Sequence, residues 1–156
     1  PVLGVVYCPT SNDLFFSLID FGAYKITIDP SSFDIEEIIK NAKKLPIKNK
    51  REYYVVVGSR SHMSKETEDF FDEKRKEFGD VKIMTKGSSL KICMVAEGKA
   101  DDYPRFAPTM EWDTAAGHAI ANMAGCKIFE FQSAQEIKYN KKSLLNPWFL
   151  VTKEIK

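Results

Sequence analysis

Residues 111–125 read EWDTAAGHAIANMAG, an acidic start followed by a run in which small side chains predominate. Asp113 falls in the first turn of the helix that this pattern predicts, where backbone N–H groups lack partners and the macrodipole is positive. The Ala and Gly residues indicate that another element approaches this helix closely, and Gly125 is suited to end it. A carboxylate at a helix N-terminus can cap the helix or help to hold a metal ion, so both roles are open for Asp113.

Composition is typical of one globular unit. The 156 residues are 44% hydrophobic and 29% charged, and 23 basic against 22 acidic residues leave a net charge of +1. A charge so close to zero gives no electrostatic footprint for nucleic acid, so we expect none as a partner. No apolar run approaches the ~20 residues of a transmembrane helix, and we expect no signal peptide. Cys8, Cys93 and Cys126 each lie in apolar surroundings, which predicts buried reduced thiols. We therefore expect a cytoplasmic protein, with peripheral attachment to the inner face of the membrane left open.

The first part of the chain predicts an antiparallel meander. Apolar, β-branched or aromatic runs over 2–7, 14–19 and 24–28 are separated by turn segments. Three strands without a preceding partner suggest that they complete a sheet whose other strands lie elsewhere. A helix is expected over 33–44, with Lys43 and Lys44 in its last turn and Pro46 beyond it.

From residue 53 onward strands and helices alternate, which predicts a layered α/β unit and an α+β chain overall. The run over 53–57 is continuously apolar, as in a strand that is buried on both faces. The further expected elements are a helix over 64–78, a strand over 81–84, a helix over 88–97, a strand over 102–106, the helix that begins near Glu111, and strands over 127–131 and 148–151. We divide the chain into residues 1–29, which belong to the sheet of an N-terminal domain outside this chain, and residues 30–156, a C-terminal substrate-binding domain.

Five motifs resemble those of a known family, and their order and spacing along the chain match it as well. They are Trp112-Asp113 with the small-residue run after it, and the segments GSRSH at 58–62, GSSLK at 87–91, YPRF at 103–106 and LNP at 145–147. The sequence is similar to the inositol monophosphatase superfamily, and within it to the CysQ-type 3'(2'),5'-bisphosphate nucleotidases, from residue 1 to about residue 151. The resemblance implies the inositol-monophosphatase-like sugar-phosphatase fold and Mg²⁺-dependent hydrolysis of adenosine 3',5'-bisphosphate to AMP and phosphate.

The resemblance also assigns roles to five residues. The polar turn at 58–62 reads equally well as a helix cap or an anion site, and the resemblance implies that His62 contacts the nucleotide. It makes Ser88 and Lys91 a substrate-binding pair and Asp113 a magnesium ligand. On its own, Arg105 reads as a surface arginine. Its planar fork suits phosphate, whereas inositol monophosphatases proper usually carry an acidic residue there, so Arg105 favours a bisphosphate nucleotide as the substrate.

Most of the carboxylates that the family uses to bind metal have no counterpart here. The family draws on an upstream Glu and an Asp-Pro-x-Asp-Gly-Thr motif, and the nearest similar segment, DPSS at 29–32, lacks its second aspartate and its Gly-Thr. One carboxylate does not hold magnesium well, because the ion requires octahedral oxygen coordination. We therefore expect a C-terminal part that needs the missing N-terminal half of the same protein as its partner and is inactive alone.

Alternatives remain open from the sequence. The chain could belong to an inositol-phosphate or other sugar-phosphate phosphatase of the same superfamily, or to a non-catalytic nucleotide-binding domain. The first strands could also pair between two copies of the chain. Near the motif helix, His118 is expected to be packed and hydrogen-bonded, and Trp112 to pack beside the site.

Overall fold

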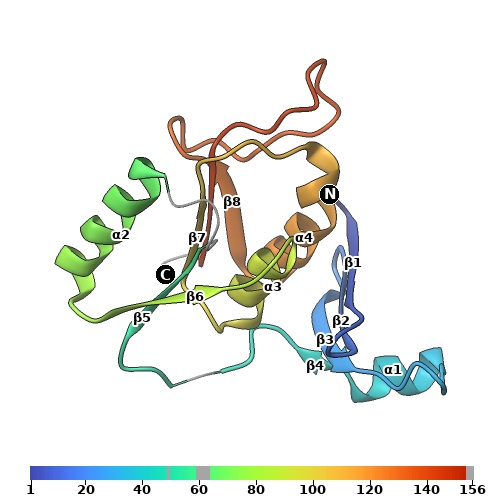
Figure 1. The fold of residues 1–156 in the computed structure, drawn as a ribbon. Coiled ribbons are helices and arrows are strands. Elements are labelled where there is room, and N and C mark those ends of the chain that lie inside the picture. Colours follow the sequence, from blue (N-terminus) through green and yellow to red (C-terminus); the bar gives the residue numbers. More distant parts are fainter. Residues whose placement is uncertain (49, 59–63, 154–156) are drawn as a thin grey trace.

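The computed structural model describes residues 1–48, 50–58 and 64–153. In chain order the elements are β1 Leu3–Cys8, β2 Asp13–Leu18, β3 Gly22–Thr27, α1 Ile35–Asn41, β4 Lys43–Lys44, β5 Tyr54–Gly58, α2 Lys65–Phe78, β6 Val81–Thr85, α3 Leu90–Glu97, β7 Asp102–Arg105, α4 Glu111–Met123, β8 Cys126–Glu130 and β9 Phe149–Lys153. They stack in layers, with α2 outermost, then a five-stranded sheet, the pair α3 and α4, and a four-stranded sheet (Figure 1). The α+β class expected from the sequence is confirmed.

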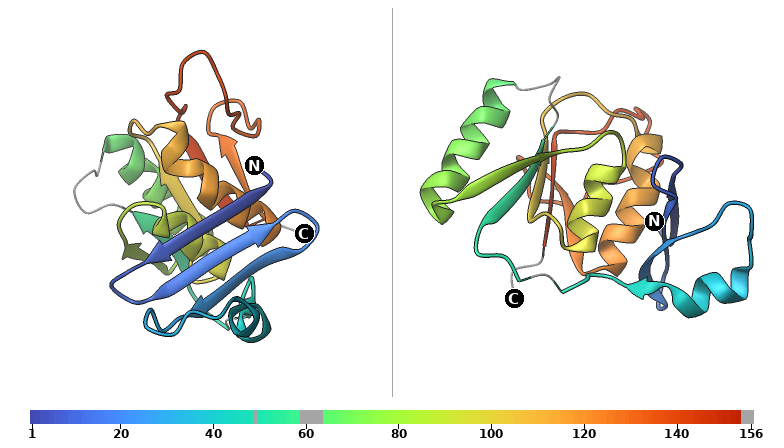
Figure 2. Two further views of the ribbon diagram at one scale, coloured as in Figure 1. Left: turned by 90° about the vertical axis from the view of Figure 1, so that its right-hand side faces the viewer. Right: turned by 60° about the horizontal axis from the view of Figure 1, so that its bottom comes forward.

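The four-stranded sheet is the predicted meander with one added strand. Its order is β1-β2-β3-β4, and each neighbouring pair is antiparallel. The sheet lies across α3 and α4 (Figure 2). Phe15 and Ala23 on its inner face pack against Cys93 and Ile120 of these helices. The domain boundary after residue 29 stays a prediction, while strand pairing in this sheet continues to Lys44.

The helix expected over 33–44 is shorter, and its predicted last turn is wrong. α1 ends at Asn41, and Ala42 takes an extended conformation with φ −68° and ψ 137°. Lys43 and Lys44 instead pair with Lys25 and Tyr24 of β3. Pro46 disfavours a helical conformation at Leu45, so the helix cannot easily continue past the two lysines. The edge of β3 offers the backbone groups of Lys43 and Lys44 hydrogen-bond partners, and strand pairing prevails.

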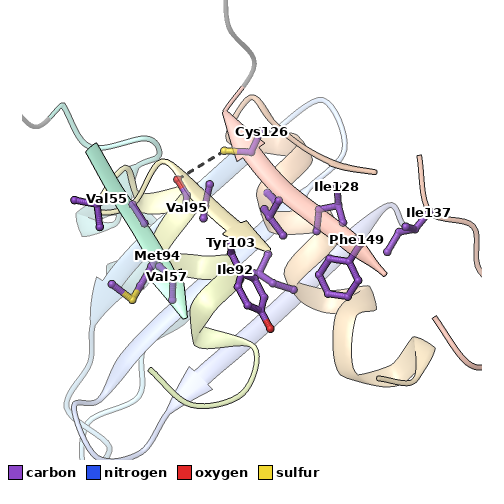
Figure 3. Close-up of a cluster of buried hydrophobic side chains, with 13 residues drawn as sticks. Val55, Val57, Ile92, Met94, Val95, Tyr103, Cys126, Ile128, Ile137 and Phe149 are labelled. Carbon is purple, nitrogen blue, oxygen red and sulfur yellow. Dashed lines mark hydrogen bonds between the residues drawn. The ribbon is translucent and has the colours of Figure 1, made fainter. Parts of the chain in front are cut away.

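The five-stranded sheet is mixed, in the order β6-β5-β7-β9-β8. β5 runs parallel to β6 and β7, whereas β9 runs antiparallel to β7 and β8. Val55 and Val57 of β5 face the cluster beneath α3 and α4, where Ile92 and Phe149 also lie (Figure 3). Val56 packs on the other face beneath α2, against Phe70 and Phe71. The prediction of a strand that is buried on both faces is therefore confirmed.

The small side chains of α4 allow two other elements to pack closely against the helix. A Cβ added at Gly4 of β1 would lie 2.2 Å from the carbonyl oxygen of Ala116. A Cβ added at Gly117 would lie 3.0 Å from Cδ1 of Ile92 in α3. The helix is thus approached by β1 on one side and by α3 on another, as its composition indicated. Gly125 follows the helix with φ +79°, the left-handed conformation expected of a residue that ends it.

The cysteines and helices bear on the expected cellular setting. Cys93 and Cys126 are buried thiols, as predicted, but Cys8 is only partly buried, because the end of β1 that carries it leads into an exposed turn. None of the helices in the described ranges is long and apolar enough to cross a membrane. The cytoplasmic location expected from the sequence stays a prediction.

Candidate active site

A cavity of about 760 Å³ opens where the parallel strands β6 and β7 end. This is the edge at which open α/β sheets commonly bind ligands. The loop before α3, the end of β7 and the first turn of α4 meet there. The lining residues are Thr85, Lys86, Gly87, Ser88, Ser89, Lys91, Ile92, Tyr103, Arg105, Pro108, Thr109, Asp113, Thr114 and Phe149. Four of the five residues proposed from the sequence, Ser88, Lys91, Arg105 and Asp113, are therefore brought together.

The loop before α3 presents its serines to this cavity. Ser88 has φ +49°, a left-handed conformation that turns the chain sharply into the helix. Ser89 occupies the N-cap position of α3, and its hydroxyl donates to the carbonyl oxygen of Asp113 at 3.1 Å. That hydrogen bond ties the loop to α4, so the first turns of the two helices border one cavity.

Lys91 is a buried cation with no anionic partner among the described residues. The residue is only 6% exposed. Its Nζ donates to the carbonyl oxygen of Lys86 at 3.2 Å and lies 5.4 Å from the centre of the Tyr103 ring. It makes no salt bridge within the described residues. Burial, and then the neighbouring charge of Arg105, lower the pKa of Lys91. Because both effects disfavour the charged form, a bound anion would stabilise this ammonium.

Arg105 adds a second positive charge. Nη2 donates to the carbonyl oxygen of Pro108 at 3.2 Å, while the buried Nε has no hydrogen-bond partner within the part of the chain described. Burial raises the pKa of the neighbouring Tyr103 hydroxyl to about 12, so Tyr103 contributes no charge near neutral pH. Lys86, Lys91 and Arg105 thus line the cavity against one lining carboxylate, that of Asp113, and this balance of charge favours an anionic ligand.

Asp113 caps α4 and also faces the cavity. Oδ2 of its carboxylate accepts a hydrogen bond from the backbone N–H of Met110 at 2.8 Å. The side chain is exposed and remains accessible to an ion from the cavity. Among the residues that the structure describes, no group of three or more His, Cys, Asp or Glu side chains could hold a metal ion. Asp113 therefore fits the role of one magnesium ligand, and the described residues do not complete the site.

Three other sequence expectations have different outcomes. His62 lies outside the described residues. His118 is fully buried, and its Nδ1 lies 2.9 Å from the hydroxyl oxygen of Tyr139, which confirms a packed, hydrogen-bonded imidazole. Trp112 is 66% exposed and does not line the cavity, so the expectation that it packs beside the site is wrong. It occupies the second position of α4 and is not among the buried residues of that helix.

Sequence reasoning missed several lining residues. Tyr103, Thr109 and Thr114 each face the cavity. Tyr103 alternates with Pro104 along β7 and so shares a face with Arg105, a signal that was present in the strand pattern. Thr114 follows Asp113 directly, but nothing in the pattern alone separates it from an ordinary helical position.

The layers, and a cavity lined by three cationic residues and one carboxylate at the carboxyl edge of the parallel strands, define a layered α/β protein with a cavity suited to an anion. The chain belongs to the inositol monophosphatase family, whose pattern its sequence matches over residues 1–153.

Individual relatives sharpen this placement. The 3'(2'),5'-bisphosphate nucleotidase CysQ of Salmonella typhimurium is 40% identical over 152 residues, which are 97% of this chain and 55% of that protein. The crystal structure of CysQ from Bacteroides thetaiotaomicron has a TM-score of 0.91 and 44% identity, and the match covers 100% of this chain and 59% of that one. Inositol monophosphatase-II from Staphylococcus aureus shares the fold with a TM-score of 0.70 at 16% identity, over 99% of this chain and 51% of that one. The chain thus spans little more than half the length of the relatives it matches.

Proposed function

We propose that the full-length protein is a magnesium-dependent 3'(2'),5'-bisphosphate nucleotidase that hydrolyses adenosine 3',5'-bisphosphate to AMP and inorganic phosphate. The observation that carries the proposal is the pairing of buried Lys91 with Arg105 in the cavity that Asp113 also lines. A substrate with two phosphates needs cations for the phosphate that stays and a metal-holding carboxylate for the phosphate that leaves. The CysQ relatives at about 40% identity support the same substrate class.

Each site residue has a role in this proposal. Ser88, Lys91 and Arg105 bind the phosphate that is retained, with Arg105 offering a planar pair of donors. His62 contacts the nucleotide portion of the substrate. Asp113 contributes one ligand to magnesium, which when bound activates water and neutralises the charge that develops on the phosphate. The chain's own residues thereby orient the substrate and place its second phosphate beside the first turn of α4, where Asp113 lies.

The outer face of the first sheet supports the proposal that an N-terminal half completes the site. Together with α1 it forms an apolar groove of about 880 Å³. Leu3, Val5, Phe33 and Ile35 are each more than half exposed there, although such side chains are normally covered in a folded protein. We infer that an N-terminal half, corresponding to the additional length of the relatives, covers this face and carries the other metal ligands. Without those ligands the isolated chain is inactive.

Arg105 decides between nucleotide and inositol substrates. In the full-length protein, Arg105→Glu is expected to lower kcat/KM for adenosine 3',5'-bisphosphate about 10- to 100-fold, since a charged hydrogen bond contributes ~1.5–3 kcal/mol. Hydrolysis of inositol 1-phosphate should not fall with it. The measurement is phosphate release from both substrates.

The control for that test is Arg75→Glu, which alters an exposed arginine on α2 that pairs with Asp72. It should leave both rates unchanged. Faster hydrolysis of inositol 1-phosphate than of the nucleotide by the unaltered protein would favour an inositol-phosphate phosphatase. Nucleotide binding without phosphate release would favour a non-catalytic binding domain.

Nucleotide binding should weaken as the pH rises. Below its pKa Lys91 is charged and attracts phosphate; because that pKa is lowered from 10.5, the charge is lost at a lower pH than for an exposed lysine. The neighbouring Tyr103 does not titrate in the range just above neutrality, because burial raises its pKa to about 12. Equilibrium titration of the full-length protein with adenosine 3',5'-bisphosphate should show this decline, and Lys91→Arg should flatten it. An identical decline in Lys91→Arg would contradict the role of Lys91.

A further inference from the structure

The segment 139–146, here called the strap, lies against the start of α4 (Figure 1). The backbone N–H of Glu111 donates to the carbonyl oxygen of Leu144 at 3.0 Å, and that of Asn146 donates to the carbonyl oxygen of Thr109 at 2.8 Å. The Glu111 carboxylate accepts the N–H of Asn140 at 2.7 Å. The first turn of α4 is therefore held from outside the helix at several points.

The side chain of Asn146 makes the most convergent contacts of the strap. The residue is 5% exposed, and its Nδ2 donates to the carbonyl oxygen of Met110 at 2.8 Å. The same nitrogen lies 3.1 Å from Oγ1 of Thr114 and 3.2 Å from Oγ1 of Thr109. Because a carbonyl oxygen can only accept, the contact with Met110 requires the nitrogen of the amide on this side.

These contacts lead directly to Asp113. Asn146 holds the carbonyl of Met110, and the N–H of the same residue holds Oδ2 of Asp113 at 2.8 Å. Thr114, the residue after Asp113, is contacted by Asn146 and also accepts the Tyr139 hydroxyl at 3.2 Å. Asn146 itself does not line the cavity, whereas Thr109, Asp113 and Thr114 do. It can therefore affect the site only through the residues that it holds.

We propose that Asn146 is a positioning residue that fixes the Asp113 carboxylate in the orientation that binds the divalent cation. The proposal rests on the proposed function for the identity of that cation. Loss of the amide removes the contacts of Asn146 with Met110, Thr109 and Thr114. The backbone around the Met110 N–H is then held less firmly, and the Asp113 carboxylate that this N–H anchors samples orientations that do not bind metal. Outer contacts of this kind commonly change metal affinity by ~10- to 100-fold.

The test uses full-length protein with Mn²⁺ as a spectroscopic probe. Asn146→Ala is expected to weaken Mn²⁺ binding, followed by electron paramagnetic resonance, about 10-fold. The half-saturating Mg²⁺ concentration for hydrolysis should rise by the same factor, while the nucleotide KM at saturating metal stays unchanged. Asn146→Ser provides a second variant if the alanine variant does not fold, with folding judged by circular dichroism.

Asn122→Ala is the matched control. Asn122 lies towards the other end of α4, and its Nδ2 donates to Glu136 at 2.9 Å, so the same side-chain type is removed from the same helix. It should leave Mn²⁺ affinity unchanged. Unchanged affinity in a folded Asn146 variant, or an equal loss in Asn122→Ala, would overturn the positioning role. If the unaltered protein releases no phosphate but binds Mn²⁺ more tightly than the Asn146 variant, the proposed function is overturned and the positioning role of Asn146 stands.

Discussion

Replacing Asp113 by Asn in the full-length protein is expected to lower the rate of phosphate release by more than about 100-fold while leaving the fold intact. The amide oxygen of Asn can still accept the hydrogen bond from the N–H of Met110, now seen at 2.8 Å. The negative charge that a divalent cation needs is lost. The substitution therefore separates the two roles that the sequence left open for this residue.

The comparison with Asp113→Ala makes the experiment decisive. Alanine removes both the charge and the cap, so the free energy of unfolding should fall by about 1 kcal/mol, whereas Asn should leave it nearly unchanged. Phosphate release at saturating nucleotide, with Mg²⁺ titrated, gives the activity, and urea unfolding gives the stability. Near-normal turnover by Asp113→Asn would leave Asp113 as a cap and remove it from the metal site.

Much of the fold could be predicted because its signals are local. The apolar run at β5, the turn segments between β1, β2 and β3, and the small residues of α4 each follow from side-chain size and period. β4 could not be predicted, because its pairing depends on a free edge of β3 that no local pattern reveals. Lys43 and Lys44 carry a helix-terminal charge signal, and the hydrogen bonds available at that edge override it.

The candidate site divides in the same way. Ser88, Lys91, Arg105 and Asp113 were found through motifs, and the cavity gathers them from three separate segments. No role could be assigned to the motif at 145–147 from the sequence. The hydrogen bond from Asn146 to Met110 joins residues that are 36 positions apart, and it exists only in the folded chain. Residues that act through other residues leave little trace in spacing or residue type.

Adding a side chain at Gly4 should have the largest effect on stability. The Cβ of Gly4→Ala would lie 2.2 Å from the carbonyl oxygen of Ala116, a backbone atom that cannot rotate away. β1 must then move off α4, and the packing of Phe15 against Ile120 loosens with it. Overpacking of this kind costs about 3 kcal/mol or more, which urea unfolding of the full-length protein would detect as a lower midpoint.

Alanine substitutions at two further glycines provide comparisons for the loss of stability expected at Gly4. Gly117→Ala places its Cβ 3.0 Å from the side chain of Ile92, which can shift, so a smaller loss of about 1 kcal/mol is expected. At Gly87 an added Cβ meets nothing within 4 Å, so Gly87→Ala should leave stability unchanged or slightly higher. The order Gly4, Gly117, Gly87 follows from what each Cβ would strike: backbone, side chain or open space. An unfolding midpoint for Gly4→Ala equal to that of Gly87→Ala would mean that β1 is not held against α4, and that the small residues at 111–125 need another explanation.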